Sequence, residues 1–152
     1  VLLAHYTALF KTHDAWTSSE PMLAVLERVG RDGVACCWDV KHTYWVGKET
    51  PETTWGRLQG WVRNTHWKDV RGFRGPMATL GRDLSRDGLL CPLGEGIVPL
   101  ELHGLLAASD YNGWLTLEWE KHWHSHIEDA DVAFPGFVRY MRGLAERFDH
   151  RN

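Results

Sequence analysis

Residues 34–39 read VACCWD, and this stretch decides the fold. Five apolar or small residues in a row are typical of a strand buried on both faces, as in a parallel sheet, and the run ends in the carboxylate of Asp39. Three other strand-like stretches also end in a polar side chain. They are residues 6–11 (YTALFK), 62–66 (VRNTH) and 113–118 (GWLTLE), which end in Lys11, His66 and Glu118.

Helical segments follow these stretches. Ser18 and Ser19 begin a predicted helix that extends to about residue 28, and Thr50-Pro51-Glu52 begins another that extends to about residue 58. Residues 100–108 predict a third helix, and Asp131 caps a last one that reaches about residue 148. The first strand ends recur at intervals of 28 and 27 residues (11 to 39, then 39 to 66). This alternation predicts an α/β fold with a parallel sheet.

The four strand ends predict one site in a β/α barrel. Side chains alternate along a strand, so Glu118 shares a face with Thr116 and Trp114, and Asp39 shares one with Cys37. Barrel active sites lie at the carboxyl ends of the strands, where these polar residues fall. Four β/α units are half of the usual eight, and a half barrel leaves open strand edges and an uncovered apolar face. We therefore expect a missing N-terminal half or pairing with another copy.

Length and composition predict a single domain over residues 1–152. The net charge of -3 gives no general attraction for nucleic acid or anionic lipid, so we expect neither as a partner. The sequence contains no apolar run near the ~20 residues of a membrane span, and its N-terminus does not resemble a signal peptide. Cys36 and Cys37 point to opposite faces of a strand, which argues against a disulfide framework and favours the reducing cytoplasm.

Several short motifs occur in order over nearly the whole chain. They are THD at residues 12–14, WDVKH at 38–42, HWKD at 66–69, LGEG at 93–96 with VP at 98–99, and YNGWLTLEWE at 111–120. In this order and spacing they resemble the sugar phosphate isomerase/epimerase family, whose fold is the xylose isomerase-like TIM barrel. The resemblance places the chain as the C-terminal half of that barrel, strands five to eight.

The resemblance implies a site for a divalent metal cation (Mn, Mg, Co or Zn). Asp39, His66 and Glu118 match three of the four metal ligands of the family. The fourth ligand is a Glu that precedes Thr-His-Asp, and this chain has Lys11 there. An ammonium group repels a nearby cation, so we expect weakened metal binding and impaired catalysis, although a neutral lysine can also act as a base.

The implied reaction is isomerisation or epimerisation of a small sugar, sugar phosphate or other sugar derivative. The cation polarises the substrate oxygens while carboxylates move the proton next to the carbonyl, which makes Glu118 and Lys11 the catalytic candidates. His42 matches a substrate-binding histidine of the family. Lys68 and Arg71 are further substrate-binding candidates, although a salt bridge at the barrel rim explains Lys68 equally well.

Two other readings stay open. The first is a non-catalytic remnant or interaction subunit of the same fold, which Lys11 and the missing half favour. The second is a relative of the endonucleases that cleave at abasic sites, which is disfavoured because the loop 69–99 has no histidine for the zinc cluster of that family.

Two local features are also ambiguous. Gly94 and Gly96 fit either a phosphate-binding turn or a plain connection, and the histidines at 122, 124 and 126 fit a solvated loop better than a metal site.

Overall fold

The computed structural model describes residues 7–71 and 89–149, which form two compact units. The first unit contains the chain up to residue 66 together with residues 111–116. The second contains residues 67–110 and the chain from residue 117 onward. The expectation of one domain over residues 1–152 stays a prediction.

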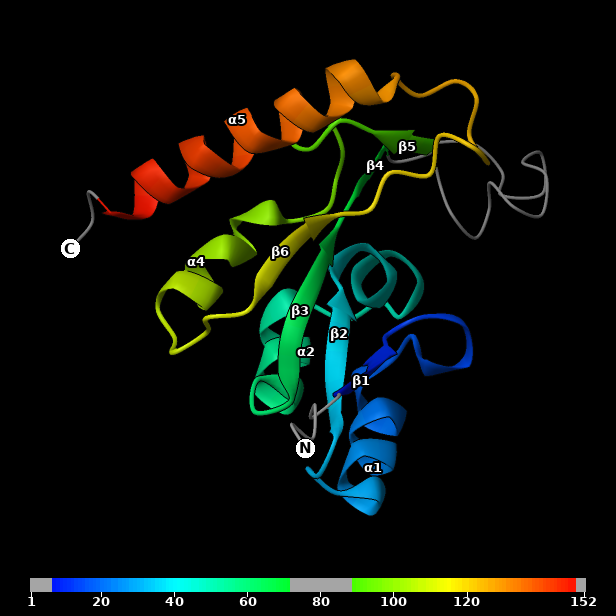
Figure 1. Cartoon of the computed structure of the whole chain (residues 1–152), viewed down its shortest axis with the longest axis vertical. Helices are drawn as coiled ribbons and strands as arrows, with labels where there is room; N and C mark the ends of the chain where they lie inside the picture. The colour runs from blue at the N-terminus through cyan, green and yellow to red at the C-terminus, as the bar shows by residue number, and fades with distance from the viewer. Residues whose placement is uncertain (1–6, 72–88, 150–152) are drawn as a thin grey trace, which may run out of the picture. The chain divides into compact units, whose positions relative to one another are not determined.

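A four-stranded sheet, in the order β1-β2-β3-β6, forms the centre of the first unit (Figure 1). The strands are β1 (Ala8–Lys11), β2 (Val34–Asp39), β3 (Val62–Trp67) and β6 (Trp114–Leu117), and the last residues of β3 and β6 belong to the second unit. β1 pairs with β2 and β2 with β3 in parallel, as the alternation of strands and helices predicts. The carboxyl ends of these three strands therefore lie at the same edge of the sheet.

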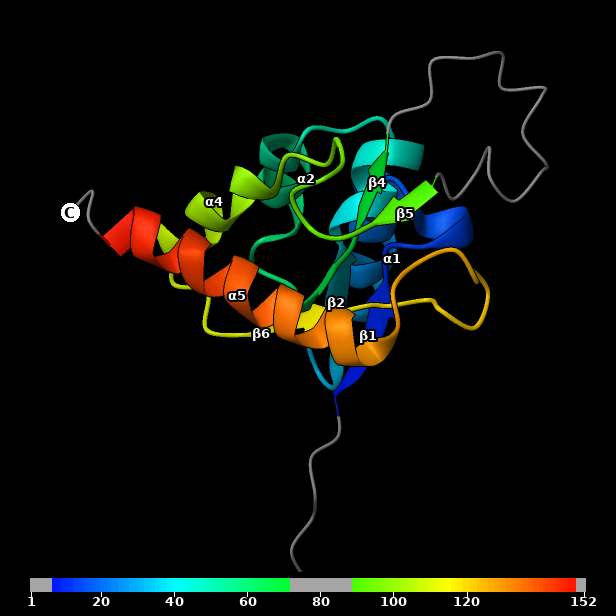
Figure 2. The same cartoon turned by 90° about the horizontal axis from the view of Figure 1, so that it is seen from above.

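Helices connect these strands, as the sequence predicts (Figures 1 and 2). A 3-10 turn (η1, Asp14–Trp16) leads into α1 (Ser19–Val29), and α2 (Pro51–Leu58) lies between β2 and β3. The helix α2 begins where the Thr50 hydroxyl accepts the N–H of Thr53, with Pro51 in its first turn. The helices bury the apolar side chains of Met22, Leu26, Trp55 and Leu58.

The strand β2 is the most deeply buried strand of the first unit. Its residues from Ala35 to Asp39 are all buried, which confirms the interpretation of the VACCWD stretch. The Trp38 ring stacks against Trp55 of α2 at a centroid distance of 5.9 Å. A π-helical turn (η2, His42–Val46), which the sequence did not predict, follows the strand, and the Trp38 indole N–H donates to Thr43 Oγ1 in it.

The second unit contains the strands β4 (Asp69–Arg71) and β5 (Leu89–Cys91), which pair in antiparallel fashion. Both strands lie in the segment 69–99, which the sequence analysis described only as a loop, and residues 72–88 of it lie outside the described residues. The predicted third helix begins as a 3-10 turn (η4, Leu100–Leu102) and continues as α4 (His103–Ala107). The last helix, α5 (Ala130–Asp149), begins one residue before the predicted cap at Asp131. Leu106 and Leu144 are buried in this unit.

Candidate functional site

Asp39 and His66 are direct neighbours at the carboxyl ends of β2 and β3, where they are paired in register. This alignment depends on a register shift between Cys36 and Cys37, because Cys36 pairs with Val62 but Cys37 pairs with Asn64. Without that shift Asp39 would pair with Thr65, and the side chains of Asp39 and His66 would point to opposite faces of the sheet. The bulge therefore brings a carboxylate and an imidazole together on one face.

Asp39 is held in a fully buried position by groups from its own strand end and from β1. Its carboxylate oxygen Oδ1 accepts the His42 N–H at 3.0 Å, and its backbone N–H donates to Thr12 Oγ1 at 2.8 Å. Lys11 Nζ lies 3.2 Å from Asp39 Oδ2, which is ion-pair distance. The structure therefore places Lys11 at the predicted position among the strand ends, in direct contact with one of the three predicted metal ligands.

His42, which the family resemblance implies as a substrate-binding residue, is buried beside Asp39. Its Nε2 atom lies 3.9 Å from Asp39 Oδ2, and its ring lies 4.0 Å from the ring of His13 between centroids. These contacts come from the first turn after β2, where the Asp39 carboxylate caps the turn through the His42 backbone N–H. In this structure His42 packs against the carboxylate, and substrate contact by His42 stays a prediction.

Glu118 follows β6 in the second unit, and its carboxylate contacts Lys68. The Glu118 N–H donates to the Trp67 carbonyl oxygen at 3.1 Å, which continues the strand pairing by one residue. Lys68 is buried, and its Nζ lies 2.9 Å from Glu118 Oε2 and 2.7 Å from Glu120 Oε1. His124 Nε2 lies 3.4 Å from Glu120 Oε2. Lys68 therefore forms ion pairs, as one of the two interpretations of this residue expected, and substrate contact by Lys68 stays a prediction.

Arg71, the other candidate for substrate binding, lies on the exposed side of β4. Its Nη2 atom lies 2.8 Å from Glu95 Oε2, and both side chains are more than half exposed. An exposed pair of this kind leaves the guanidinium accessible to solvent. Substrate binding by Arg71 stays a prediction.

Asp69 is a structural residue that the sequence analysis considered only as part of the motif HWKD at residues 66–69. Its buried carboxylate accepts four backbone N–H groups, two on Oδ1 from Val70 and Val98 and two on Oδ2 from Gly94 and Gly96, at 2.8–3.0 Å. Burial raises the pKa of this carboxyl, and the four hydrogen bonds act in the opposite direction. The amides of Gly94 and Gly96 thus bind a carboxylate of the chain, which favours the interpretation of this segment as a connecting turn over a phosphate cradle.

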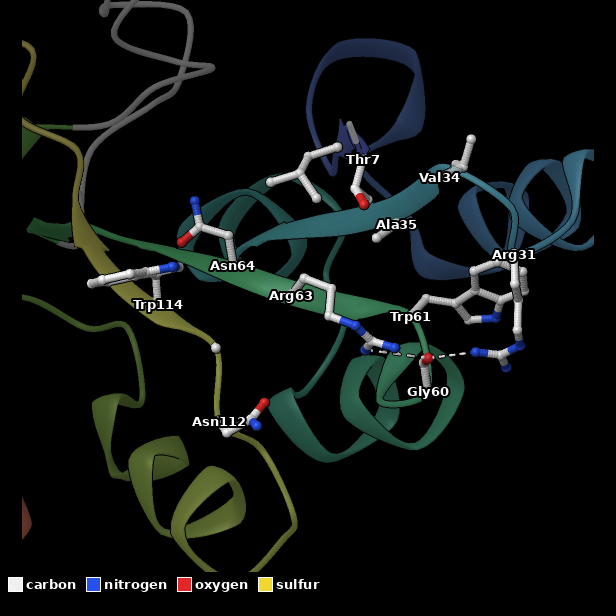
Figure 3. Close-up of a pocket in the computed structure, with 12 residues that line it drawn as sticks. Thr7, Arg31, Val34, Ala35, Gly60, Trp61, Arg63, Asn64, Asn112 and Trp114 are labelled. Carbon is white, nitrogen blue, oxygen red and sulfur yellow. Dashed lines mark hydrogen bonds between the residues drawn. The ribbon is translucent and has the colours of Figure 1, made fainter. Parts of the chain in front are cut away.

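A cavity of about 500 Å³ lies at the other end of the sheet, around the amino ends of the strands (Figure 3). Arg31 and Arg63 both donate to the carbonyl oxygen of Gly60, at 2.6 and 3.5 Å, and the Arg31 guanidinium lies over the Trp61 ring. The two arginines therefore stabilise the turn before β3. In β/α barrels this end of the sheet serves stability, and the chemistry takes place at the other end.

The sequence profile of the family described as "Xylose isomerase-like TIM barrel" matches residues 4–139. The chain belongs to this family. The prediction of the fold from the ordered motifs is confirmed. None of the helices in the described part of the chain combines the length and apolarity that crossing a membrane requires.

Solved structures with the same fold share little sequence with this chain. A xylose isomerase domain protein from Planctomyces limnophilus is 21% identical with a TM-score of 0.66, and the match covers 95% of this chain and 46% of that one. The probable 3-DHS dehydratase AsbF of Bacillus anthracis, involved in petrobactin synthesis, is 20% identical with a TM-score of 0.58, covering 74% and 43%. A D-tagatose 3-epimerase-like protein is 14% identical with a TM-score of 0.63, covering 89% and 43%.

The matched region is therefore less than half the length of each of these structures, and at these identities the likeness concerns the fold. A comparison with the curated proteins gave no match.

Proposed function

We propose that the protein is a divalent-metal-dependent isomerase or epimerase of a small sugar or sugar derivative. The observation that carries this proposal is the pairing of Asp39 with His66 at the carboxyl ends of two parallel strands. Barrels of this kind perform their chemistry at that end. Membership of the xylose isomerase-like family and the likeness to an epimerase-like structure support the same reaction class.

The residue types fit a divalent cation. Asp39 offers a carboxylate oxygen and His66 an imidazole nitrogen, a combination that suits Mn²⁺, Co²⁺ or Zn²⁺ and leaves Mg²⁺ open. We assign Glu118 as the third ligand, since it follows β6, the neighbour of β3, and its N–H donates to Trp67, the residue after His66. Lys11 is the one member of the set that does not fit, because its ammonium pairs with Asp39.

A bound cation would polarise the substrate oxygens and so acidify the proton on the carbon next to the carbonyl. In this proposal the Glu118 carboxylate takes that proton and returns it to the neighbouring carbon in an isomerisation. An epimerisation also needs a second group that delivers a proton to the opposite face of the same carbon, and Lys11 is the catalytic candidate for that role. Lys68 holds this carboxylate in place through its contact at 2.9 Å, and Glu120 balances the charge of the buried ammonium. His42, Lys68 and Arg71 are proposed to contact the substrate.

The experiment that tests this function combines metal titration with a panel of substrates. We expect the protein to bind Mn²⁺ and to interconvert at least one aldose–ketose or epimer pair, with deuterium from D₂O entering the product at the exchanged carbon, followed by NMR. The variants His66→Ala and Glu118→Gln should lose turnover, whereas His122→Ala, an exposed histidine of the loop after Glu120, should keep it. Turnover that survives His66→Ala, or that persists in the presence of EDTA, would refute the metal-dependent mechanism.

A second candidate function is that of a non-catalytic member of the fold. The ion pair between Lys11 and Asp39 favours it, since a buried carboxylate that already has a cationic partner has its charge balanced without a metal. Absence of turnover together with absence of Mn²⁺ binding, in a protein that unfolds cooperatively, would support this candidate over the enzyme.

We further propose that a second copy of the chain covers the open face of the sheet. Within residues 7–71 and 89–149, the part that the structure describes, the sheet has four strands with β1 and β6 at its edges, whereas a complete barrel has eight. Two apolar side chains on the strands that line the cavity of Figure 3 are exposed, Leu9 by 43% and Trp114 by 79%. Light scattering should give the mass of a dimer, and Leu9→Glu combined with Trp114→Glu should give a monomer. A wild-type monomer at high micromolar concentration would refute this arrangement.

A further inference from the structure

The Asp39 carboxylate already has a cationic partner where the proposed metal would bind. Lys11 Nζ lies 3.2 Å from Oδ2, and the other oxygen, Oδ1, accepts the His42 N–H. Asp39 itself is fully buried, so water contributes little to the stabilisation of its charge. The ammonium of Lys11 therefore supplies the compensating positive charge.

A divalent cation on the same oxygen would meet strong repulsion from that ammonium. Two positive charges within a few Å of each other disfavour one another, and burial strengthens the effect. The Lys11 side chain is nevertheless 26% exposed, and its ammonium stands at the end of four flexible methylene groups. The group can consequently move into solvent when a cation takes its place, whereas Asp39 cannot move out of the core.

We propose that Lys11 is an internal competitor for the divalent cation, so that its ammonium and the metal occupy the Asp39 carboxylate alternately. The inference rests on the proposed metal site and adds a regulation of that site by the chain itself. The protein then folds with a charge-balanced strand end in the absence of metal. Loading requires a cation concentration high enough to displace the ammonium.

The test is a Mn²⁺ titration followed by electron paramagnetic resonance, on the wild-type chain and on two variants. Lys11→Met removes the charge and keeps the length of the side chain, and we expect its affinity for Mn²⁺ to rise at least about tenfold. Lys11→Glu adds a carboxylate ligand and should bind more tightly still. Lys48→Met, which removes an exposed lysine next to Trp45, lowers the net charge equally and should leave the affinity unchanged.

Thermal unfolding gives a second, independent readout. Without metal, Lys11→Met should melt at a lower temperature than the wild-type chain, because the buried Asp39 carboxylate loses its ion pair with Lys11. Added Mn²⁺ should raise its melting temperature more than that of the wild-type chain. Asp39→Asn introduced into Lys11→Met should abolish both the binding and the rescue, which places the metal on Asp39.

Equal Mn²⁺ affinities for the wild-type chain and Lys11→Met would overturn the competition and leave the proposed metal-dependent function in place. Failure of the wild-type chain and of both Lys11 variants to bind Mn²⁺, although each unfolds cooperatively, would overturn the proposed metal site and the competition with it. If Lys11→Met does not fold, Lys11→Gln serves in its place with the same expectations.

Discussion

Lys68 Nζ lies 2.9 Å from Glu118 Oε2 and is almost completely buried. The same ammonium lies 2.7 Å from Glu120 Oε1, so one cation connects two carboxylates that follow β6. Both carboxylates are about one quarter exposed, and they keep part of their hydration. Lys68 is therefore placed to fix the direction of Glu118, and its charge offsets the repulsion between the two carboxylates.

Lys68→Met should lower the free energy of unfolding by about 2 kcal/mol, because it removes the ion pairs with Glu118 and Glu120 and leaves two carboxylates close together. Urea unfolding at pH 7 measures this change. Arg71→Met is the matched control, since its pair with Glu95 is exposed and should contribute much less to the free energy of unfolding. Equal losses in the two variants would show that the buried position of Lys68 adds nothing to its contribution.

Asp69→Asn should destabilise the second unit by at least about 2 kcal/mol. The Asn amide nitrogen cannot accept a hydrogen bond, so two of the four N–H groups around the carboxylate lose their acceptor in a buried position. Hydrogen exchange should show the loss at the amides of Gly94, Gly96 and Val98 in particular. Protection of these amides that equals the wild-type value would contradict the assigned role of Asp69.

The pattern of strands and helices could be predicted from sequence because it depends on short-range signals. The VACCWD stretch is apolar throughout, and Thr50 and Pro51 mark the start of α2 with a side-chain cap and a fixed φ. Family motifs added the order of the units. These features need no knowledge of distant contacts.

The arrangement around Asp39 and Asp69 could not be predicted in the same way, because it depends on pairing between distant segments. The register shift at Cys36 and Cys37 has no marker such as a glycine, yet it decides that Asp39 faces His66. The four donors to Asp69 come from residue 70 and from residues 94–98, so a single buried acid organises a turn far away in sequence. The short β4–β5 pair was missed because three-residue strands carry too little periodicity.

The buried thiols should be inert in the native protein and should make stability depend on pH above 9. Burial, with a smaller effect of the neighbouring Cys37, raises the pKa of Cys36 from 9.0 to about 12, and burial raises the pKa of Cys91 to about 12 as well. Between these values the unfolded chain loses thiol protons that the folded chain keeps, so the free energy of unfolding falls as pH rises from 9 towards 12. Below pH 9 the contribution of these thiols is complete.

The reaction with a disulfide reagent at pH 8 tests whether the buried thiols are inert. We expect slow labelling of the native chain and rapid labelling in urea. Urea unfolding of the wild-type chain and of Cys91→Ala between pH 8 and 10.5 tests the fall of the free energy of unfolding with pH. The variant should show a weaker dependence on pH. Rapid labelling of all thiols under native conditions would contradict the burial of these residues.

Gly94 and Gly30 form a pair that separates the strain of the backbone from the lack of space. Both glycines have positive φ, +88° and +87°, so a side chain at either position strains the backbone. At Gly30, where ψ is 174°, that strain costs about 1–3 kcal/mol, because almost only glycine adopts this combination of angles. A Cβ at Gly30 would meet no atom within 4 Å, whereas a Cβ at Gly94 would collide with the Tyr140 ring of α5. Gly30→Ala should therefore lower the free energy of unfolding only through the backbone strain.

Gly94→Ala should lower the free energy of unfolding by the backbone strain and by a further ~1–3 kcal/mol, because Tyr140 is forced to move. Tyr140→Ala removes the ring, and in that background Gly94→Ala should cost no more than Gly30→Ala does in the wild-type chain. A double-mutant cycle by urea unfolding measures this coupling. Additive losses from Gly94→Ala and Tyr140→Ala would show that α5 does not restrict the turn, and that the positive φ alone requires glycine there.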